Sequence, residues 1–196
     1  MTEIEKLHLK IAKCNRCNSI TNYRKFPAVA HGNIHSKNMI ISEAPARVSV
    51  GINKFWTGNA GLLLRNCINS VGKDLEKDFY ITDVVKCWPN IAGRNRKPKP
   101  QEVTNCRAFV LKEIELLNPR NILLFGQLAS GLLLENGSRM EDYHGKIQEY
   151  EGGITVYFFY HPSYILRQLN KNFTEEYEHL LIKTFSKIFN HGPATT

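Results

Sequence analysis

The sequence predicts an α/β fold of three layers, in which helices cover both faces of a central, mostly parallel four-stranded sheet. Short apolar segments typical of strands alternate with segments whose apolar residues recur at helical spacing. The polar residues best suited to chemistry, Glu43, Asp83 and His161, each stand at the carboxyl end of a predicted strand. Because ligands of open α/β sheets bind beyond those strand ends, the three side chains predict one site.

The order of the predicted elements supports this fold. The first helix begins at a capping box from Thr2 to Glu5 and continues with Ile4, Leu7 and Ile11 on one face. The predicted strands cover residues 39–42, 79–82, 121–125 and 154–159. Helices are expected over 58–71, from 100 to about 117, from 126 onwards, and over a closing segment marked by Phe173, Tyr177, Leu181, Phe185 and Ile188. No repeat or linker interrupts them, so we expect one domain of residues 1–196.

Length and composition are those of an ordinary globular domain. The chain has 196 residues, of which 42% are hydrophobic and 22% charged, and a domain of this size folds without disulfides. Its apolar stretches are too short to span a membrane, and its first residues do not resemble a signal peptide, so we expect a cytoplasmic monomer with no membrane partner. The net charge of +8 favours a nucleic-acid partner, with a merely lysine-rich composition as the alternative.

The cysteines predict a metal site. There are five, an odd number, which argues against a disulfide framework in a reducing compartment. Cys14 and Cys17 form a C-x-x-C pair, while Cys87 and Cys106 flank a basic, proline-rich segment. Cys67 lies in a helical stretch and is expected to be packed and inert. Four thiolates suit either zinc or an iron–sulfur cluster, and spacing alone favours zinc.

Four blocks of sequence carry a specific resemblance. They are Cys14-x-x-Cys17; SEAPA at 42–46 with FWTGNAG at 55–61; YITDVVKC at 80–87 with PKPQE at 98–102 and Cys106; and HPSYILR at 161–167. In this order, they resemble the iron–sulfur branch of the uracil-DNA glycosylase superfamily, called family 4, with some features of family 5. The resemblance implies a DNA glycosylase that cuts a flipped base from its sugar and leaves an abasic site.

The resemblance also favours a structural [4Fe–4S] cluster over zinc on the four paired cysteines. The cluster would pin the basic loop between Cys87 and Cys106, which is about three residues longer than is usual in the family. Basic side chains of this loop would then contact DNA phosphates, unless the loop is simply solvated. These residues are Arg94, Arg96, Lys97 and Lys99.

The same resemblance implies a base pocket. Trp56 stands where the family stacks an aromatic ring on the base, beside Ala44 and Pro45 of the turn after the first strand; a core tryptophan is the alternative. His161 matches a histidine that hydrogen-bonds the base oxygen O2 and stabilises the departing anion. Glu43 matches a glutamate that either places water or holds the turn. The following residues 47–50 carry no carboxylate, so no further water-activating base is predicted.

Asp83 departs from the family, which has asparagine at this position. Asparagine both donates and accepts, whereas an ionised aspartate only accepts and suits the N4 amine of cytosine. A protonated Asp83 would still serve uracil. Because removal of ordinary cytosine would destroy the host genome, we expect a C5-modified cytosine, as in foreign phage DNA, and a defence role. Ordinary uracil repair is the alternative.

The last motif predicts a DNA-inserting loop. Ile165 or Leu166 would fill the gap left by the flipped base, with Ser163, Tyr164 and Arg167 on the DNA; a plain helix start is the alternative. Among rival functions, a zinc deaminase lacks its H-x-E and P-C-x-x-C strings, and a dinucleotide enzyme lacks G-x-G-x-x-G. A catalytically inactive DNA-binding module on the same fold stays open.

Overall fold

The computed structural model describes residues 1–21, 30–52, 54–134 and 137–190. Within these residues, six strands form one sheet in the order β1-β3-β2-β6-β8-β7, and two short strands form a separate hairpin. The sheet strands are β1 His31–Gly32, β2 Asn38–Ser42, β3 Tyr80–Asp83, β6 Asn121–Phe125, β7 Ile147–Tyr150 and β8 Ile154–Phe159. The hairpin consists of β4 Asn90–Ile91 and β5 Arg94–Asn95.

The helices lie between the strands in sequence, as the alternating pattern predicts. They are α1 Glu3–Ala12, α2 Asn18–Thr21, α3 Arg47–Ile52, α4 Asn59–Asn69, α5 Leu75–Asp78, α6 Pro100–Leu117, α7 Gln127–Ser130, α8 Met140–Tyr143, α9 Pro162–Arg167 and α10 Lys171–Asn190, with a 3₁₀ turn η1 at Glu151–Gly153. The capping box predicted at Thr2 is present, since Thr2 Oγ1 accepts from the Glu5 amide and the Glu5 carboxylate accepts from the Thr2 amide. No helix in the described part of the chain is long and apolar enough to cross a membrane.

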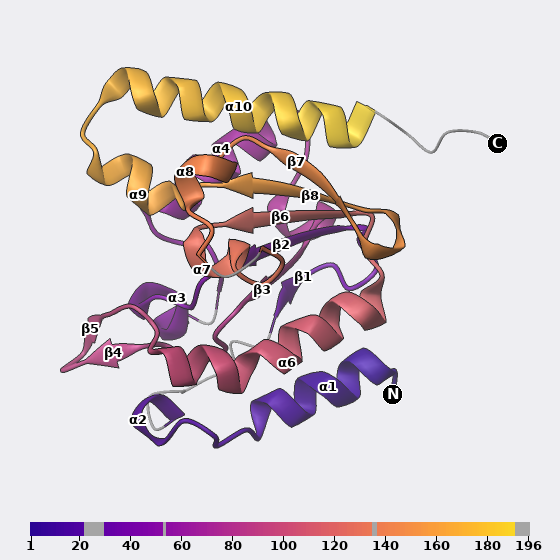
Figure 1. Cartoon of the computed structure of the whole chain (residues 1–196), viewed down its shortest axis with the longest axis vertical. Helices are drawn as coiled ribbons and strands as arrows, with labels where there is room; N and C mark the ends of the chain where they lie inside the picture. Colours follow the sequence, from indigo (N-terminus) through magenta and orange to yellow (C-terminus); the bar gives the residue numbers. More distant parts are fainter. Residues whose placement is uncertain (22–29, 53, 135–136, 191–196) are drawn as a thin grey trace.

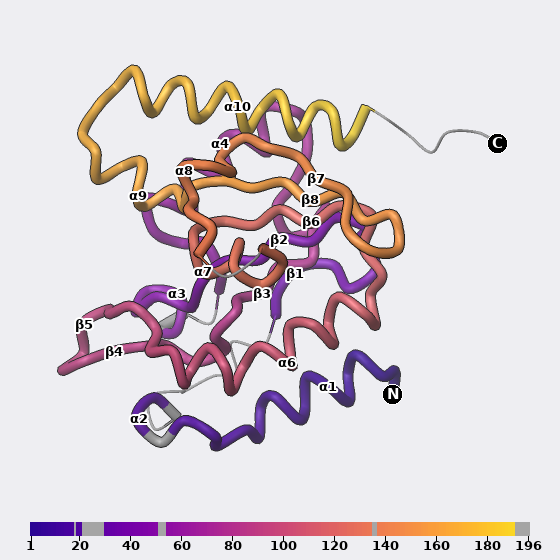
Figure 2. The backbone as a smooth tube through the Cα atoms, in the orientation of Figure 1, coloured from indigo at the N-terminus to yellow at the C-terminus, as the bar shows by residue number. Residues whose placement is uncertain are grey.

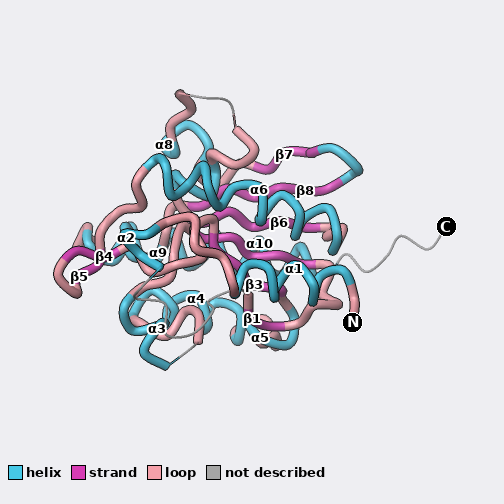
Figure 3. Tube along the Cα trace, turned by 90° about the horizontal axis from the view of Figure 1, so that it is seen from below, coloured by secondary structure: helices cyan, strands magenta, loops and turns pink. Residues whose placement is uncertain are grey.

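The elements stack in three layers. α4, α9 and α10 pack on one face of the sheet, and α6 packs on the other, with α1 lying outside α6 (Figure 1). Figure 2 follows the chain from the indigo α1 beside α6 to the yellow α10 on the opposite side of the sheet. Seen from below in Figure 3, α1 and α6 lie in front of the strands. The sheet is therefore buried on both faces, which explains its continuous apolar strands.

The strand directions bring the predicted site residues to one edge. β3, β2, β6 and β8 are parallel, so their carboxyl ends meet, with Ser42 opposite Asp83 and Phe125 opposite Phe159. The chain passes from β2 to β3 on one side and later to β6 on the other. A crevice therefore opens at the end of β2, where ligands of such sheets bind.

The α/β prediction is confirmed, but the strand number was underestimated. The four predicted strands form the parallel centre, and β1 and β7 add antiparallel edges. β1 is only two residues long, and β7 is mostly exposed, so neither shows the apolar pattern of a buried strand. The basic loop expected between Cys87 and Cys106 contains the β4–β5 hairpin, whose two strands are only two residues long each.

Candidate functional site

A cavity of about 610 Å³ lies beyond the carboxyl ends of the central strands. Its wall includes Glu43, Trp56, Asp83 and His161, which the sequence predicts for base binding and catalysis. The parallel register of the sheet brings Glu43, Asp83 and His161 together, and Trp56 joins them from the segment between α3 and α4. The remaining wall comprises the turn after β2, including the predicted base contacts Ala44 and Pro45, and part of the segment that follows β3.

Asp83 is buried, and its two carboxylate oxygens have different environments. The Ser42 hydroxyl, at the end of β2, donates to Oδ1. The other oxygen, Oδ2, is buried and has no hydrogen-bond partner among the described residues. Burial raises the pKa of Asp83 from its ordinary 3.8 to about 7, against the opposing effect of the Ser42 bond. The carboxyl group of Asp83, a residue of the cavity wall, therefore gains or loses a proton near neutral pH.

His161 is held as a neutral imidazole of one tautomer. It precedes α9, and its Nδ1 accepts from the Ser163 amide at 3.2 Å and lies 2.8 Å from the Ser163 hydroxyl. A backbone amide can only donate, so the ring proton lies on Nε2. Burial, together with the charge of Arg167, lowers the pKa of His161 to about 4. The side chain is therefore an uncharged donor at neutral pH.

Trp56 is fixed by a strained backbone and by two rings. Its φ is +55°, a left-handed conformation that is uncommon for a bulky side chain. Its backbone lies against Gly61 of α4, where any Cβ would overlap the Trp56 carbonyl. The indole packs edge-on against Phe125 at 5.5 Å and lies nearly parallel to the His161 ring, at 5.2 Å between centroids and 14° between planes. Strain of this kind is typical of functional positions.

Glu43 lies at the crevice where β2 ends. Its Oε1 accepts from the Leu128 amide at 3.2 Å, so the structure contains the turn-holding contact considered for this residue. Gly126, with φ of +96°, leaves the space for this carboxylate, since a Cβ there would come within 2.7 Å of Oε1. Burial raises the pKa of Glu43, and the Leu128 bond and the charges of Lys97 and Arg167 oppose that rise.

The four predicted metal ligands line one small cavity between the 14–17 loop, the segment after β3, and α6. Cys87 and Cys106 are buried, and burial raises the pKa of Cys106, with Cys17 and Cys14 near enough to contribute. As placed, no three metal-binding side chains of the described residues form a group that could hold an ion. The all-thiolate donor set and its location in one cavity fit a thiolate site. Cys67 is buried in the core, as predicted, and burial raises its pKa to about 12.

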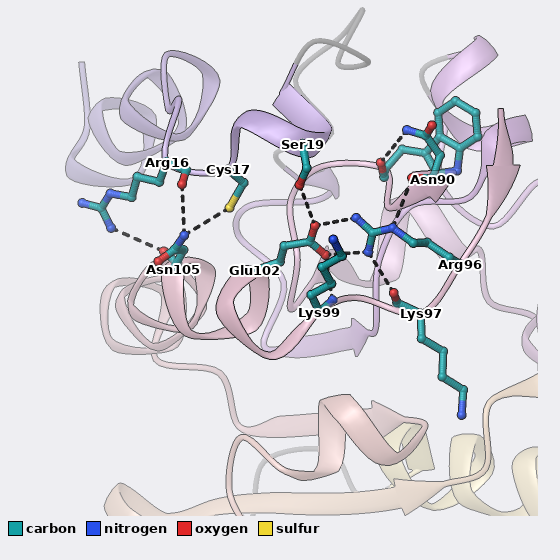
Figure 4. Close-up of polar contacts among 10 residues, drawn as sticks. Arg16, Cys17, Ser19, Asn90, Arg96, Lys97, Lys99, Glu102 and Asn105 are labelled. Carbon is teal, nitrogen blue, oxygen red and sulfur yellow. Dashed lines mark hydrogen bonds and ion pairs between the residues drawn. The ribbon is translucent and has the colours of Figure 1, made fainter. Parts of the chain in front are cut away.

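Polar contacts tie this cysteine region to the basic loop (Figure 4). The Asn105 amide donates to the Arg16 carbonyl at 3.1 Å and to Cys17 Sγ at 3.3 Å. One turn away, Glu102 accepts from Ser19 at 3.1 Å and from the Arg96 guanidinium at 2.8 and 2.5 Å. The bonds with Arg96 lower the pKa of Glu102 to about 2. α6 therefore anchors both the N-terminal loop and the loop that borders the large cavity.

The basic loop divides into pinned and exposed cations. Arg96, expected to contact phosphate, is mostly buried, and Glu102 and main-chain carbonyls occupy its donors, so its observed role is structural. Arg94, Lys97 and Lys99 are exposed. Lys97 lines the large cavity and points away from the Glu102 contacts (Figure 4). For Arg94, Lys97 and Lys99, contact with DNA phosphates stays a prediction.

The α9 motif is placed only partly as expected. Ile165 is 0% exposed and belongs to the core, so the prediction that it inserts into DNA is wrong; the helix turns it towards α4 and α10. Leu166 is half-buried against the same core. Ser163 and Arg167 line the large cavity, and Tyr164 is exposed and packs on Tyr160.

Three residues of interest escaped the sequence analysis. Ser42 holds Asp83, and the parallel register of their strands was the signal that could have found it. Asn95 lines the cavity from the hairpin. Leu169, in the connection between α9 and α10, is 93% exposed with a φ of +52°. No periodic pattern marks the last two, because both lie outside long elements.

Comparison with known proteins identifies the family of this chain. A family model described as the uracil DNA glycosylase superfamily matches residues 29–183. A type-4 uracil-DNA glycosylase of Pyrobaculum aerophilum is 31% identical over 85% of this chain and 86% of its own length. A type-4 uracil-DNA glycosylase of Thermotoga maritima is 31% identical, with 81% and 80% covered. A type-5 uracil-DNA glycosylase of Pyrobaculum aerophilum is 28% identical, with 79% and 80% covered. The resemblance to this superfamily that the sequence motifs indicated is confirmed.

Proposed function

Because the chain belongs to the uracil-DNA glycosylase superfamily, and is therefore a DNA glycosylase, we propose that it hydrolyses the N-glycosidic bond of a base flipped out of DNA. The observation that carries this proposal is that Trp56, Asp83 and His161 line one cavity at the carboxyl ends of the sheet. A glycosylase needs a stacking surface and groups that read the base edge. These side chains supply both.

The near-parallel rings of Trp56 and His161 support a specific pose. At an ordinary ring spacing of about 3.5 Å, their 5.2 Å centroid separation leaves a lateral offset of roughly 4 Å. A base stacked on the indole would then lie close to the plane of the imidazole. The Nε2–H of His161 could meet its O2 edge-on, as a hydrogen bond to a base requires.

His161 would act on the leaving base. Water attacks C1′ of the sugar while the bond from C1′ to the base nitrogen breaks; the electron pair leaves with the base, and the proton that the water loses is taken up by the released base through solvent. Negative charge then grows on the base, and a preorganised donor to O2 stabilises it, with an effect on the order of 10²–10³ in rate. A neutral imidazole can still donate through Nε2–H, and its burial carries no cost of removing a charge from water. Glu43 would add negative charge near the cationic sugar while Oε1 holds the turn.

For the base itself, we propose a cytosine-type substrate, most simply one modified at C5, as in foreign DNA, with anti-phage defence as the role. The unpaired Oδ2 of Asp83 supports this, because an ionised oxygen accepts from the N4 amine of cytosine. Ordinary uracil is the second candidate, favoured by the type-4 relatives and by a pKa of about 7, which leaves much of Asp83 protonated and able to donate to O4.

We further propose a [4Fe–4S] cluster on Cys14, Cys17, Cys87 and Cys106, in preference to zinc. The shared cavity and the all-thiolate donor set support it. Such a cluster supplies a rigid cross-link among the 14–17 loop, the segment after β3, and α6. Exposed Arg94, Lys97, Lys99 and Arg167 would contact phosphates, and the chain would act as a single domain. Iron analysis and visible absorbance test the cluster: a colourless protein that carries zinc would refute it.

The activity test is incubation with oligonucleotides that carry uracil, hypoxanthine, cytosine or C5-modified cytosines, with mass analysis of the released bases. Alkali-induced strand breakage, dependent on His161, would separate an enzyme from an inactive DNA-binding module. A protein that binds these oligonucleotides and releases no base would refute the proposal. Release of uracil alone would refute the cytosine assignment and keep the glycosylase.

A further inference from the structure

The wall of the large cavity that faces α9 is formed by the β4–β5 hairpin and the residues around it. Pro89, Asn95 and Lys97 line the cavity from this segment, and His161 lines it from the start of α9. In Figure 1 the hairpin and α9 both lie at the end of the sheet to which the strand arrows point, one below it and one above. A ligand that contacts His161 therefore presents its far side towards the hairpin.

Asn95 is oriented by two donors. Its Oδ1 accepts from the Trp88 indole Nε1 at 2.7 Å and from the Arg47 amide at 3.0 Å. Both partners can only donate, so the oxygen and nitrogen of this amide are assigned without ambiguity. Its Nδ2 has no partner among the described residues and keeps two hydrogens to donate. The cavity wall thus contains a fixed amide donor that the proposed reaction does not use.

The atom order of a pyrimidine shows which part of the base faces this donor. With O2 at His161 and the C4 substituent at Asp83, C5 follows C4 on the side remote from His161. We assign that side to the hairpin, where Asn95 lines the cavity and accepts from the Arg47 amide at the start of α3. Any substituent on C5 would therefore extend towards Asn95, and a cavity of about 610 Å³ is within the range that encloses ligands larger than one base.

We propose that Asn95 is a specificity-determining residue that donates a hydrogen bond to an oxygen atom on the C5 substituent of the flipped base. The assignment rests on the proposed function and narrows it, because it selects substituents that carry a hydrogen-bond acceptor, such as a hydroxyl, over purely apolar ones. Asn95 is exposed in the free protein and would be covered only when the base and its substituent fill the cavity; a donor covered without a matching acceptor loses its hydrogen bonds to water, so such a ligand is disfavoured.

The test compares two substituents of equal size, hydroxymethyl and ethyl, on C5 of cytosine and of uracil in matched oligonucleotides. We expect the wild type to release the hydroxymethyl base about tenfold faster in kcat/KM, the usual value of one hydrogen bond to a neutral group. Asn95→Asp keeps the oxygen that accepts from Trp88 and Arg47 and replaces the donor with an acceptor, so it should abolish this preference. Ala92→Asp, at the exposed hairpin tip outside the cavity wall, adds the same charge and should preserve it.

Three results of this test would each overturn the assignment of Asn95. Equal loss on both substituents in Asn95→Asp would mean that the amide serves the DNA backbone or the fold, and would overturn the assignment. A wild type that does not distinguish the pair would overturn it as well, while leaving the glycosylase activity intact. A wild type that releases none of these bases would overturn the proposed function and this assignment together.

Discussion

The protonation of Asp83 should decide which base the cavity accepts, so pH should change the preference. Protonated Oδ2 donates to the O4 of uracil, and ionised Oδ2 accepts from the N4 amine of cytosine. With a pKa of about 7, the ratio of ionised to protonated Asp83 changes tenfold per pH unit. The ratio of kcat/KM for a cytosine-type base to that for uracil should rise about 100-fold from pH 6 to pH 8.

The ratio is the quantity to measure, because DNA binding and base flipping affect both substrates alike. Oligonucleotides that differ only in the target base give it directly at each pH. Asp83→Asn supplies a fixed donor and acceptor, so this variant should favour uracil with a ratio that does not depend on pH. A wild-type ratio that stays constant within about twofold over this range would refute the reasoning.

Stability gives an independent check on the same group. The folded-state pKa of Asp83 lies above its ordinary 3.8, so its contribution to stability is present at low pH and is lost as pH rises through about 7. Asp83→Asn removes this loss. Between about pH 4 and pH 8, the free energy of unfolding of the variant should improve relative to wild type by on the order of 4 kcal/mol. An unchanged difference in urea titrations would show that Asp83 does not titrate near neutrality.

Three further predictions concern neighbouring features. Ser42→Ala removes the bond that lowers the pKa of Asp83, so the pH at which the two bases are released equally fast should move upwards; an unmoved crossing would contradict it. Leu169 is exposed and strained, as expected of a side chain that fills the gap left by a flipped base, so Leu169→Ala should weaken activity on double-stranded DNA and leave activity on single strands unchanged. The control Leu9→Ala, at another exposed leucine, should change neither activity. Glu113→Leu removes the carboxylate partner of the buried Lys86 ammonium. The free energy of unfolding measured in urea should therefore fall by about 3–5 kcal/mol, and a fall under 1 kcal/mol would be evidence against a buried Lys86–Glu113 ion pair.

The central sheet and the convergence of the site could be predicted from the sequence because each depends on a local pattern. Buried parallel strands are apolar runs, and parallel strands align their ends, so the sequence alone predicts that Asp83 and His161 lie at one edge of the sheet. The edge strands lacked such a pattern. Ile165 shows the limit of motif transfer: its position in the motif predicted exposure, but the path of α9 after His161 turns it into the core.

Contacts between distant segments could not be predicted for a different reason. Arg96 and Lys97 are adjacent in sequence and both line the large cavity, yet Glu102 binds the Arg96 guanidinium while Lys97 stays exposed. The outcome depends on where the first turn of α6 lies relative to the hairpin. No property of either residue encodes that position. The same holds for Asn95, whose orientation is set by Trp88 and Arg47.

The location of the cysteines indicates how a cluster there would affect base reading. In the described chain none of the four predicted cysteine ligands lines the large cavity, so a cluster bound to them would act through the polypeptide. The path is short, because every residue from Asp83 to Cys87 is buried and Val84 and Val85 continue the pairing with the end of β2. Lys86, within it, is pinned by Glu113 at 2.7 Å. Fixing Cys87 would therefore fix Asp83 on one side and, through Trp88, Asn95 on the other, so one cross-link would position both groups proposed to read the base.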